Sequence, residues 1–331
     1  MTSNNVEHPF AEFIRILGKG KKGSRPLTQE EAHQAMRMIL AGEVEEIQLG
    51  AFLMLMRVKE ETPEELAGFV LAVRETLPDI PANTADLDWS AYAGKRRHLP
   101  WFILSSLLLA ENGVKILMHG SASHSENRLF AQDMLSLFSL AIADSCAAAE
   151  QQLQTQNFAY LSIERLCPAL NRMIHLRNLM GLRSPVHTLV RLINPFNAPY
   201  SIQGIFHPGY RPVHQEAALL LKQAHMTVIK GEGGETERNP DMECLAQSVH
   251  EGLLSEETWP ALFSRRHVKP EKLEPKQLIQ VWRGELQDEF AEASIIGTTA
   301  VALKLLNKVN TQASAQQLAT EYWHNRNKNG Y

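Results

Sequence analysis

Apolar and polar residues alternate with a helical period over the first 80 positions of the chain. Thr28 stands before one apolar stripe, and Glu31 follows at the spacing that lets each side chain bond to the other residue's backbone amide. Gly42 can end this helix. Thr62 begins a second start signal, with Pro63 at the first helical position, where a missing N–H group is tolerated. The pattern therefore predicts consecutive helices at the beginning of the chain.

A third stretch, from Leu49 to Val58, is almost wholly apolar rather than striped. A helix that is apolar on every side has to be buried, so we expect it to pack within the chain or against another subunit. Pro78 ends the helical region, and residues 78–88 have the composition of a linker. We predict a helical domain over residues 1–82.

Short apolar runs that suit buried parallel strands follow the linker and alternate with helical stretches. The predicted strands are Val114–Met118, Phe158–Ser162, Ile202–Phe206 and Met226–Lys230. This alternation favours an α/β domain with a mostly parallel central sheet over residues 83–331. Functional loops of such sheets lie beyond the carboxyl ends of the strands, so a site is expected in the segments that follow them.

The overall charge narrows the choice of ligand. The 331 residues include 33 Lys and Arg against 37 Asp and Glu, a formal net charge of −4. A phosphate-rich partner would therefore have to be bound by local clusters of cations. Met1–Pro9 lacks the apolar core of a secretory signal, and the apolar run Trp101–Ala110 is too short to span a bilayer. Three distant cysteines without a C-x-x-C pair suggest reduced thiols, so we expect a cytoplasmic protein with no membrane partner.

Two such clusters of cations are present. The first lies in the glycine-containing segment Arg15–Arg25, whose further cations are Lys19, Lys21, Lys22 and Arg25. The second consists of Lys95, Arg96 and Arg97, and the aromatic residues around it are Trp89, Tyr92 and Trp101. Cations beside a cleft can contact phosphates without reading bases, and aromatic rings can stack on bases. Both clusters could equally be solvated loops, and the aromatic residues could equally belong to the core.

The run Leu27–Leu77 resembles the helical domain of anthranilate phosphoribosyltransferase, a member of glycosyltransferase family 3 together with the pyrimidine nucleoside phosphorylases. The resemblance implies a small all-α N-terminal domain and a large α/β domain of the nucleoside phosphorylase/phosphoribosyltransferase type. It also implies that a later segment, about residues 175–195, could contribute to the helical domain. In this family the helical domain forms the interface of a homodimer.

The α/β part departs from the motifs of these enzymes. Their loop GTGGD, whose backbone amides cradle a diphosphate, corresponds to Ala91–Arg97, where only Gly94 remains. Their motif KHGNR corresponds to Met118–Ala122, in which only His119 and Gly120 match. The resemblance thus implies a phosphoribosyl diphosphate site that has lost two glycines and two cations.

The Mg²⁺-binding acidic pair of the family corresponds to residues 231–237 in this chain. Glu237 matches the family's glutamate, but Thr236 replaces the aspartate, which weakens a site that should offer carboxylate oxygens. A better match is the segment Leu176–Arg183, which follows the family pattern V-R-x-x-L-G-x-R. The resemblance places Arg177 where the enzymes contact the carboxylate of anthranilate, and Arg183 at the end of the same motif.

The departures are similar to those of a TrpD-like subgroup, the YbiB-like proteins. The shared features include the stretches Cys167–Leu170, His187–Leu189, His207–Tyr210 and Asn239–Pro240. That subgroup keeps the fold, forms homodimers and is described as binding nucleic acid without sequence preference. Resemblance to it implies the same partners here.

The leading hypothesis is a binder of nucleic acid or another polyanion that lacks anthranilate phosphoribosyltransferase activity. The cations that would line or rim the former substrate cleft are Lys95, Arg96, Arg97, Arg177 and Arg183, with the loop Lys19–Lys22 extending it. The alternative is an active enzyme that transfers phosphoribose to anthranilate or another acceptor, or cleaves a nucleoside with phosphate. His119, Arg177 and Glu237 would serve that enzyme, with Mg²⁺ as its cofactor. A protein-interaction module is the third hypothesis, and no catalytic residue is assigned.

Overall fold

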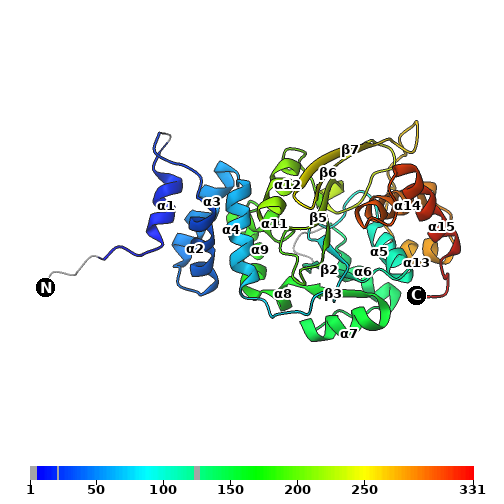
Figure 1. The fold of residues 1–331 in the computed structure, drawn as a ribbon, viewed down its shortest axis with the longest axis horizontal. Coiled ribbons are helices and arrows are strands. Elements are labelled where there is room, and N and C mark those ends of the chain that lie inside the picture. Colours follow the sequence, from blue (N-terminus) through cyan, green and yellow to red (C-terminus); the bar gives the residue numbers. More distant parts are fainter. Residues whose placement is uncertain (1–5, 21, 123–126) are drawn as a thin grey trace.

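The computed structural model describes residues 6–20, 22–122 and 127–331 of the chain. Lys21, one of the predicted cations, lies outside the described residues. Helices form the N-terminal end of the molecule (Figure 1). They are α1 (Ala11–Gly18), α2 (Gln29–Leu40), α3 (Glu46–Lys59) and α4 (Pro63–Arg74).

The predicted helix starts are confirmed by their capping bonds. The Thr28 hydroxyl accepts from the Glu31 amide at 3.2 Å, and the Glu31 carboxylate accepts from the Thr28 amide at 2.8 Å. Thr62 and Glu65 make the same exchange at 3.3 and 2.9 Å, with Pro63 as the first residue of α4. Each exchange satisfies two amides that have no partner within the helix.

The apolar stretch 49–58 is a helix, α3, but only one side of it is buried within the chain. Leu49, Phe52, Leu53 and Met56 lie in the core. On the other side, Ile47 and Val58 are 83% and 78% exposed. The chain by itself therefore leaves part of this helix uncovered.

The large domain is built on a seven-stranded sheet in the order β3-β2-β1-β4-β5-β6-β7. Its strands are β1 (Leu87–Ala91), β2 (Ile116–Gly120), β3 (Phe158–Ser162), β4 (Tyr200–Ile205), β5 (His225–Lys230), β6 (Cys244–His250) and β7 (Leu253–Trp259). The first five pair in parallel. The fold class of a small helical domain and a larger α/β domain with a mostly parallel sheet is confirmed.

Two features of the sheet differ from the prediction. The linker ends earlier than expected, because Leu87 and Asp88 are buried residues of β1. The hairpin of β6 and β7 was not expected, and it adds antiparallel strands to one edge. Its turn uses Glu251 and Gly252, both with positive φ, as tight hairpins require. β7 is mostly exposed and carries Glu256 and Glu257, so it lacks the apolar run of a buried strand.

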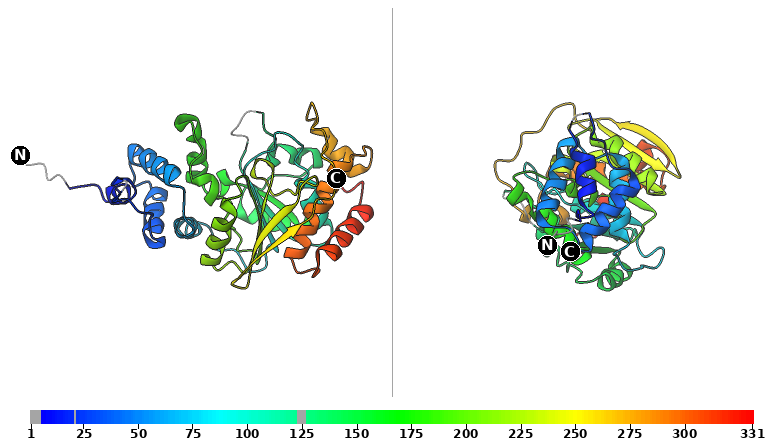
Figure 2. Two further views of the ribbon diagram at one scale, coloured as in Figure 1. Left: turned by 90° about the horizontal axis from the view of Figure 1, so that it is seen from above. Right: turned by 90° about the vertical axis from the view of Figure 1, so that its left-hand side faces the viewer.

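Helices cover both faces of the sheet. They are α5 (Phe102–Glu111), α7 (Cys146–Gln156), α8 (Ile163–Leu166), α9 (Pro168–His175), α10 (Arg177–Met180), α11 (Val186–Leu189), α12 (Tyr210–Leu220), α13 (Lys276–Arg283), α14 (Glu289–Leu305) and α15 (Gln312–Asn325), besides the single turn α6 (Ala131–Met134) and the 3₁₀ segments η1 (Leu135–Phe138) and η2 (Glu232–Gly234). The C-terminal helices lie at the end of the molecule away from the N-terminal helices (Figures 1 and 2).

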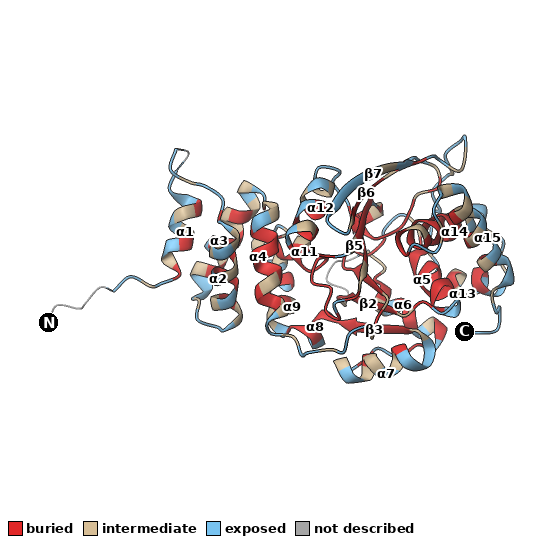
Figure 3. Cartoon of the chain, viewed as in Figure 1, coloured by how far each residue is buried: buried red, intermediate tan, exposed pale blue. Residues whose placement is uncertain are grey.

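Successive strand residues divide between two cores, as the pleat requires. In β2, Ile116 and Met118 face the core formed with α5, α14 and α15, while Leu117 belongs to the core that reaches the N-terminal helices. Figure 3 shows the buried residues running through the sheet and into α4. Both faces of the parallel strands are therefore covered.

The N-terminal helices and the large domain share one of these cores. Helix α4 packs on α11 and α12, and its Arg74 donates to the carbonyl of Ile193 at 2.7 Å. This contact joins the segment after α11 to the N-terminal helices. The domain boundary at residues 82–83 and the contribution of residues 175–195 to the helical domain stay predictions. Within the described residues, no helix is long and apolar enough to cross a membrane.

Candidate functional site

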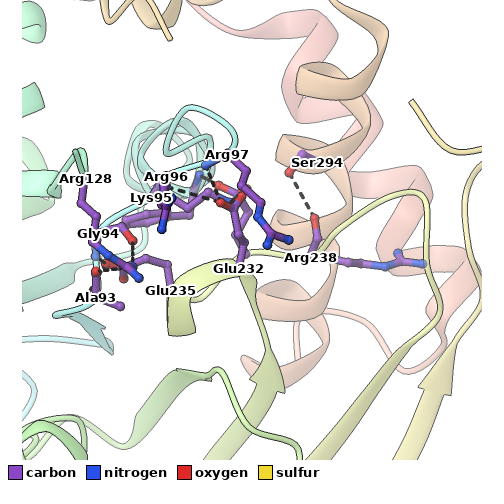
Figure 4. Close-up of polar contacts among 12 residues, drawn as sticks. Ala93, Gly94, Lys95, Arg96, Arg97, Arg128, Glu232, Glu235, Arg238 and Ser294 are labelled. Carbon is purple, nitrogen blue, oxygen red and sulfur yellow. Dashed lines mark hydrogen bonds and ion pairs between the residues drawn. The ribbon is translucent and has the colours of Figure 1, made fainter. Parts of the chain in front are cut away.

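Two loops meet at the carboxyl edge of the sheet, where a site is expected. One follows β1 and runs from Ala91 to Arg97, and the other follows β5 and contains residues 231–237, which we call the acidic loop. Figure 4 shows the contacts between them. Strand order explains the meeting, since β1 and β5 both flank β4 in the sheet.

The amides of the first loop are bound by a carboxylate of the chain itself. One oxygen of Glu235 accepts hydrogen bonds from the backbone N–H groups of Ala93 and Gly94, at 2.8 and 2.5 Å. Glu235 is fully buried, and burial raises the pKa of its carboxyl group, an effect opposed by these amides and by Arg191. By the resemblance, these are the amides that would cradle a diphosphate.

A second carboxylate of the acidic loop binds the next two amides. One oxygen of Glu232 accepts from the backbone N–H groups of Arg97 and Arg96, at 2.6 and 3.3 Å. Glycines allow the two loops to come this close. Gly233 has a φ of +71°, and a Cβ atom there would lie 2.7 Å from the carbonyl oxygen of Gly94.

Lys95 points inward, between the carboxylates. Its ammonium group lies 2.5 Å from Glu237 and 3.1 Å from Glu232, and only 2% of the residue is exposed. Burial alone would lower the pKa of Lys95, but the two carboxylates outweigh it and the pKa is raised. Lys95 is therefore a charged group of the interior.

This arrangement corrects two predictions. Lys95 was expected to contact an external polyanion, but its charge is buried and neutralised by Glu237 and Glu232. Glu237 was expected to bind a metal, but one of its oxygens bonds Lys95 and the other accepts from the amide of Phe102 at 2.8 Å. No cluster of metal-binding side chains is found among the described residues.

His119 and Gly120, which match the family motif, lie beneath the loops and out of reach of solvent. The His119 ring contacts the Tyr92 hydroxyl at 2.7 Å and lies 3.0 Å from the Asp88 carboxylate, with His119 and Asp88 fully buried. A Cβ atom on Gly120 would lie 2.2 Å from the carbonyl oxygen of Ala91. Both residues therefore hold strands β1 and β2 together, and neither faces solvent.

The aromatic residues around the basic loop also belong to the interior. Trp89, Tyr92 and Trp101 are 0%, 2% and 3% exposed. Trp89 stacks on Phe102 of α5. None of the three has a face free for a base, so the core interpretation of these residues is confirmed.

The remaining predicted cations form part of an arginine cluster above the loops. Arg96 and Arg97 are exposed, and Arg177 and Arg183 are half-buried. Burial lowers the pKa of Arg183 to about 10, and the nearby charges of Arg191, Arg128 and Arg177 add to the shift. Each of these cations disfavours the positive charge of its neighbours, so together they create a region of positive potential. An anion bound there would reduce the repulsion between them.

Two members of this cluster were not predicted. Arg128 donates to the carbonyls of Ala93 and Gly94 at 3.0 and 2.9 Å, which anchors it over the basic loop. Arg191, 8% exposed, donates to the carbonyl of His187. Each is a lone arginine in its segment, so no charge run in the sequence marks it. Only the meeting of separate loops brings them together.

A cavity of about 120 Å³ opens beside the arginine cluster, between the large domain and helix α3. Its charged walls are Arg57, Glu61, Arg183 and Arg191. Three arginines face one glutamate in this wall, and burial raises the pKa of Glu61, which disfavours its negative charge, so the charge in the wall is predominantly positive. The cavity can accept an anion more readily than a cation.

The first basic cluster is not near this cavity in one chain. Lys19 and Lys22 are exposed in the connection between α1 and α2. Helix α4 lies between these two helices and the large domain (Figure 1). Arg25 forms two bonds of 2.6 Å to Glu31. The described residues Lys19 and Lys22 therefore do not extend the cleft within a single chain, contrary to prediction.

Both parts of the chain match family models that together describe this architecture. Residues 11–77 match the helical bundle domain of the glycosyl transferase family, and residues 103–327 match its a/b domain. The chain belongs to glycosyl transferase family 3. The predicted resemblance to this family, with its TrpD-like members, is confirmed.

Known relatives agree with this assignment. Anthranilate phosphoribosyltransferase of Caldivirga maquilingensis is 30% identical over 294 residues, 86% of each chain. The crystal structure of the Thermus thermophilus enzyme (TrpD) gives a TM-score of 0.77 at 21% identity, covering 96% of this chain and 94% of that one. The Saccharomyces cerevisiae enzyme in complex with PRPP and Mg gives 0.76 at 18% identity, with the same coverage. These structures establish the fold.

The buried ion pair allows a test of the site. Lys95→Met leaves the buried Glu237 and the partly buried Glu232 without their cation, and breaking a buried pair in this way costs about 3–5 kcal/mol. We expect the free energy of unfolding to fall by about that amount at pH 7, measured by urea denaturation. The control is Lys308→Met at an exposed lysine, which should change it by under about 0.5 kcal/mol.

The loss in the Lys95→Met protein should depend on pH. Burial raises the pKa of Glu237, and the cation that opposes this effect is removed. Between the unfolded pKa of about 4.3 and the raised native pKa, the native state binds a proton that the unfolded state has released. The variant should therefore lose stability as pH rises through this window. A deficit of the same size at pH 4 and pH 8 would contradict the assignment.

Proposed function

We propose that this family member binds nucleic acid through the arginine cluster and does not transfer phosphoribose to anthranilate. The observation that carries the proposal is the contact between the two loops. The carboxylates of Glu232 and Glu235 accept from the amides that would receive a diphosphate. A ligand with the same charge as these carboxylates would have to displace them.

The proposal rests on a second contact, at the place of the metal. The Saccharomyces cerevisiae enzyme is described with PRPP and Mg, and by resemblance Mg²⁺ would bind the acidic loop. Here the Lys95 ammonium lies between Glu232 and Glu237. The residues present do not fit a divalent cation, because the Lys95 ammonium already lies between these carboxylates and both Glu237 oxygens have protein partners.

The arginine cluster favours a polyanion as the alternative ligand. Arg96, Arg128, Arg177 and Arg183 come from three separate segments and lie close enough to disfavour one another's charge, and the exposed Arg97 follows Arg96 in the chain. The acids closest to them are turned inward toward amides and Lys95. A chain of phosphates can satisfy several arginines at once without base-specific contacts.

We also propose that the chain forms a homodimer through its N-terminal helices. Ile47 and Val58, on the uncovered side of α3, are the most exposed large apolar residues of helices α1 to α4. A second copy would bury them. Such a surface is self-complementary in a two-fold dimer.

The nucleic-acid proposal predicts a change in salt dependence. Binding of a short labelled single-stranded DNA should weaken with salt at about −0.7 log units per neutralised phosphate. Arg96→Ala combined with Arg97→Ala should make this slope shallower by about 1.4. The matched control, Arg265→Ala with Arg266→Ala, removes another exposed Arg-Arg pair that lines neither the cluster nor its cavity. Equal slopes in the two variants would remove the cluster from the binding site.

The loss of transferase activity has a separate test. A ligand that binds the native state at 100 times its dissociation constant stabilises it by about 2.7 kcal/mol. Because the loop amides and acidic loop are already paired, we expect phosphoribosyl diphosphate with Mg²⁺ to leave the melting temperature unchanged. An upward shift that requires both components would instead support the enzyme hypothesis, and release of diphosphate on adding anthranilate would establish it.

The dimer proposal predicts that charged substitutions on α3 lower the mass of the particle in solution. Ile47→Lys combined with Val58→Glu places charges on the uncovered side of α3, and burying unpaired charges in an interface is costly. Light scattering after size exclusion should give twice the chain mass for the natural protein and the chain mass for the variant. The control is Leu253→Lys with Leu254→Glu on strand β7, which should leave the mass unchanged.

A further inference from the structure

Phe206 is the exception among the aromatic side chains. All phenylalanine, tyrosine and tryptophan residues of the chain lie in its described part, and Phe206 alone is exposed, at 51%. A single exposed apolar residue needs no explanation by itself. The position of this one does, because it follows β4 at the carboxyl edge of the sheet, beside the arginine cluster.

Two cavities meet at this residue. The cavity of about 120 Å³ described above is lined on one side by Phe206 and His207. A second cavity, of about 370 Å³, is lined by the same two residues and extends toward the ends of β5 and β6. The two hollows therefore adjoin at Phe206 and His207, and we call them together the groove.

Cations line the groove on both sides of the ring. On the first side they are Arg57, Arg183 and Arg191, with one acid, Glu61. On the second side they are Arg97, Arg211 and Lys230, with two acids, Glu232 and Glu243. Glu232 already accepts from backbone amides and pairs with Lys95. The groove thus has an excess of positive charge on each side of an exposed aromatic face.

The ring is held in place without being covered. Its backbone packs against the acidic loop, where a Cβ atom on Gly234 would lie 3.4 Å from the Phe206 amide nitrogen. The ring meets the His207 ring edge to face, with centroids 4.8 Å apart. A side chain supported in this way loses little freedom when a flat group stacks on it.

We propose that Phe206 stacks on a base of a single-stranded nucleic acid whose flanking phosphates lie against the cations of the two cavities. This inference rests on the proposed function and adds to it the recognition of bases as well as phosphates. Aromatic residues between cations are the pattern by which single strands are held without sequence preference. A duplex offers its bases already stacked on one another, so the single strand is the occupant.

The experiment compares two strands with equal numbers of phosphates: an oligomer of thymidine and an abasic oligomer of the same length. We expect the natural protein to bind the thymidine strand about 5- to 100-fold more tightly, the range for one or more stacked bases. Phe206→Ala should bring this ratio close to one, and Phe206→Trp should keep it. The matched control, Leu254→Ala, truncates a residue of similar exposure, 48%, on β7 and should also keep it.

The outcomes separate this inference from the proposed function. Equal affinity of the natural protein for the two strands, or a ratio that survives in Phe206→Ala, would overturn the stacking role while the binding of phosphates stands. If neither strand binds at low salt, both proposals fail. Thermal denaturation of each variant checks that the fold is intact, which is expected because half of the Phe206 surface already faces solvent.

Discussion

The pairing of Lys95 with Glu237 and Glu232 is the contact on which the arrangement at the sheet edge depends. It places one cation and two carboxylates inside the protein, where an unpaired charge would be costly. Because Lys95 comes from the loop after β1 and the carboxylates come from the loop after β5, the pair ties the two loops together. The contacts of Glu235 with the Ala93 and Gly94 amides follow from the same closure.

Two residues that match the family's motifs, His119 and Gly120, have structural contacts of their own in this chain. His119 and Gly120 keep the family's motif because the strands need them, the first in a buried network with Asp88 and Tyr92, the second because its neighbour's carbonyl leaves no space for a Cβ atom. Both matching residues thus make packing contacts that account for their places in the fold. The lost glycines and cations belong to the surface that a ligand would touch.

The charge distribution resolves the apparent conflict between a net charge of −4 and a polyanion as ligand. At the sheet edge the acids turn inward to amides and to Lys95, while Arg96, Arg97, Arg128 and Arg177 remain at the surface or partly exposed. Local charge, screened over about 10 Å in salt, decides what a cleft attracts. The chain as a whole can be acidic while one groove is basic.

The pattern of residues along the chain indicates the helical domain, its capped helix starts, the apolar runs of β2, β3, β4 and β5, and the family. These follow from local periodicity and from residue types at fixed spacing, which the sequence displays directly. It did not disclose the β6–β7 hairpin, whose outer strand is polar at an exposed edge. Only the tertiary structure decided that Lys95 faces inward while Arg96 and Arg97 face outward, and that Arg128, Arg191 and Phe206 join one groove. Which side of a loop is buried depends on the distant segment that packs against it, and no local pattern records that contact.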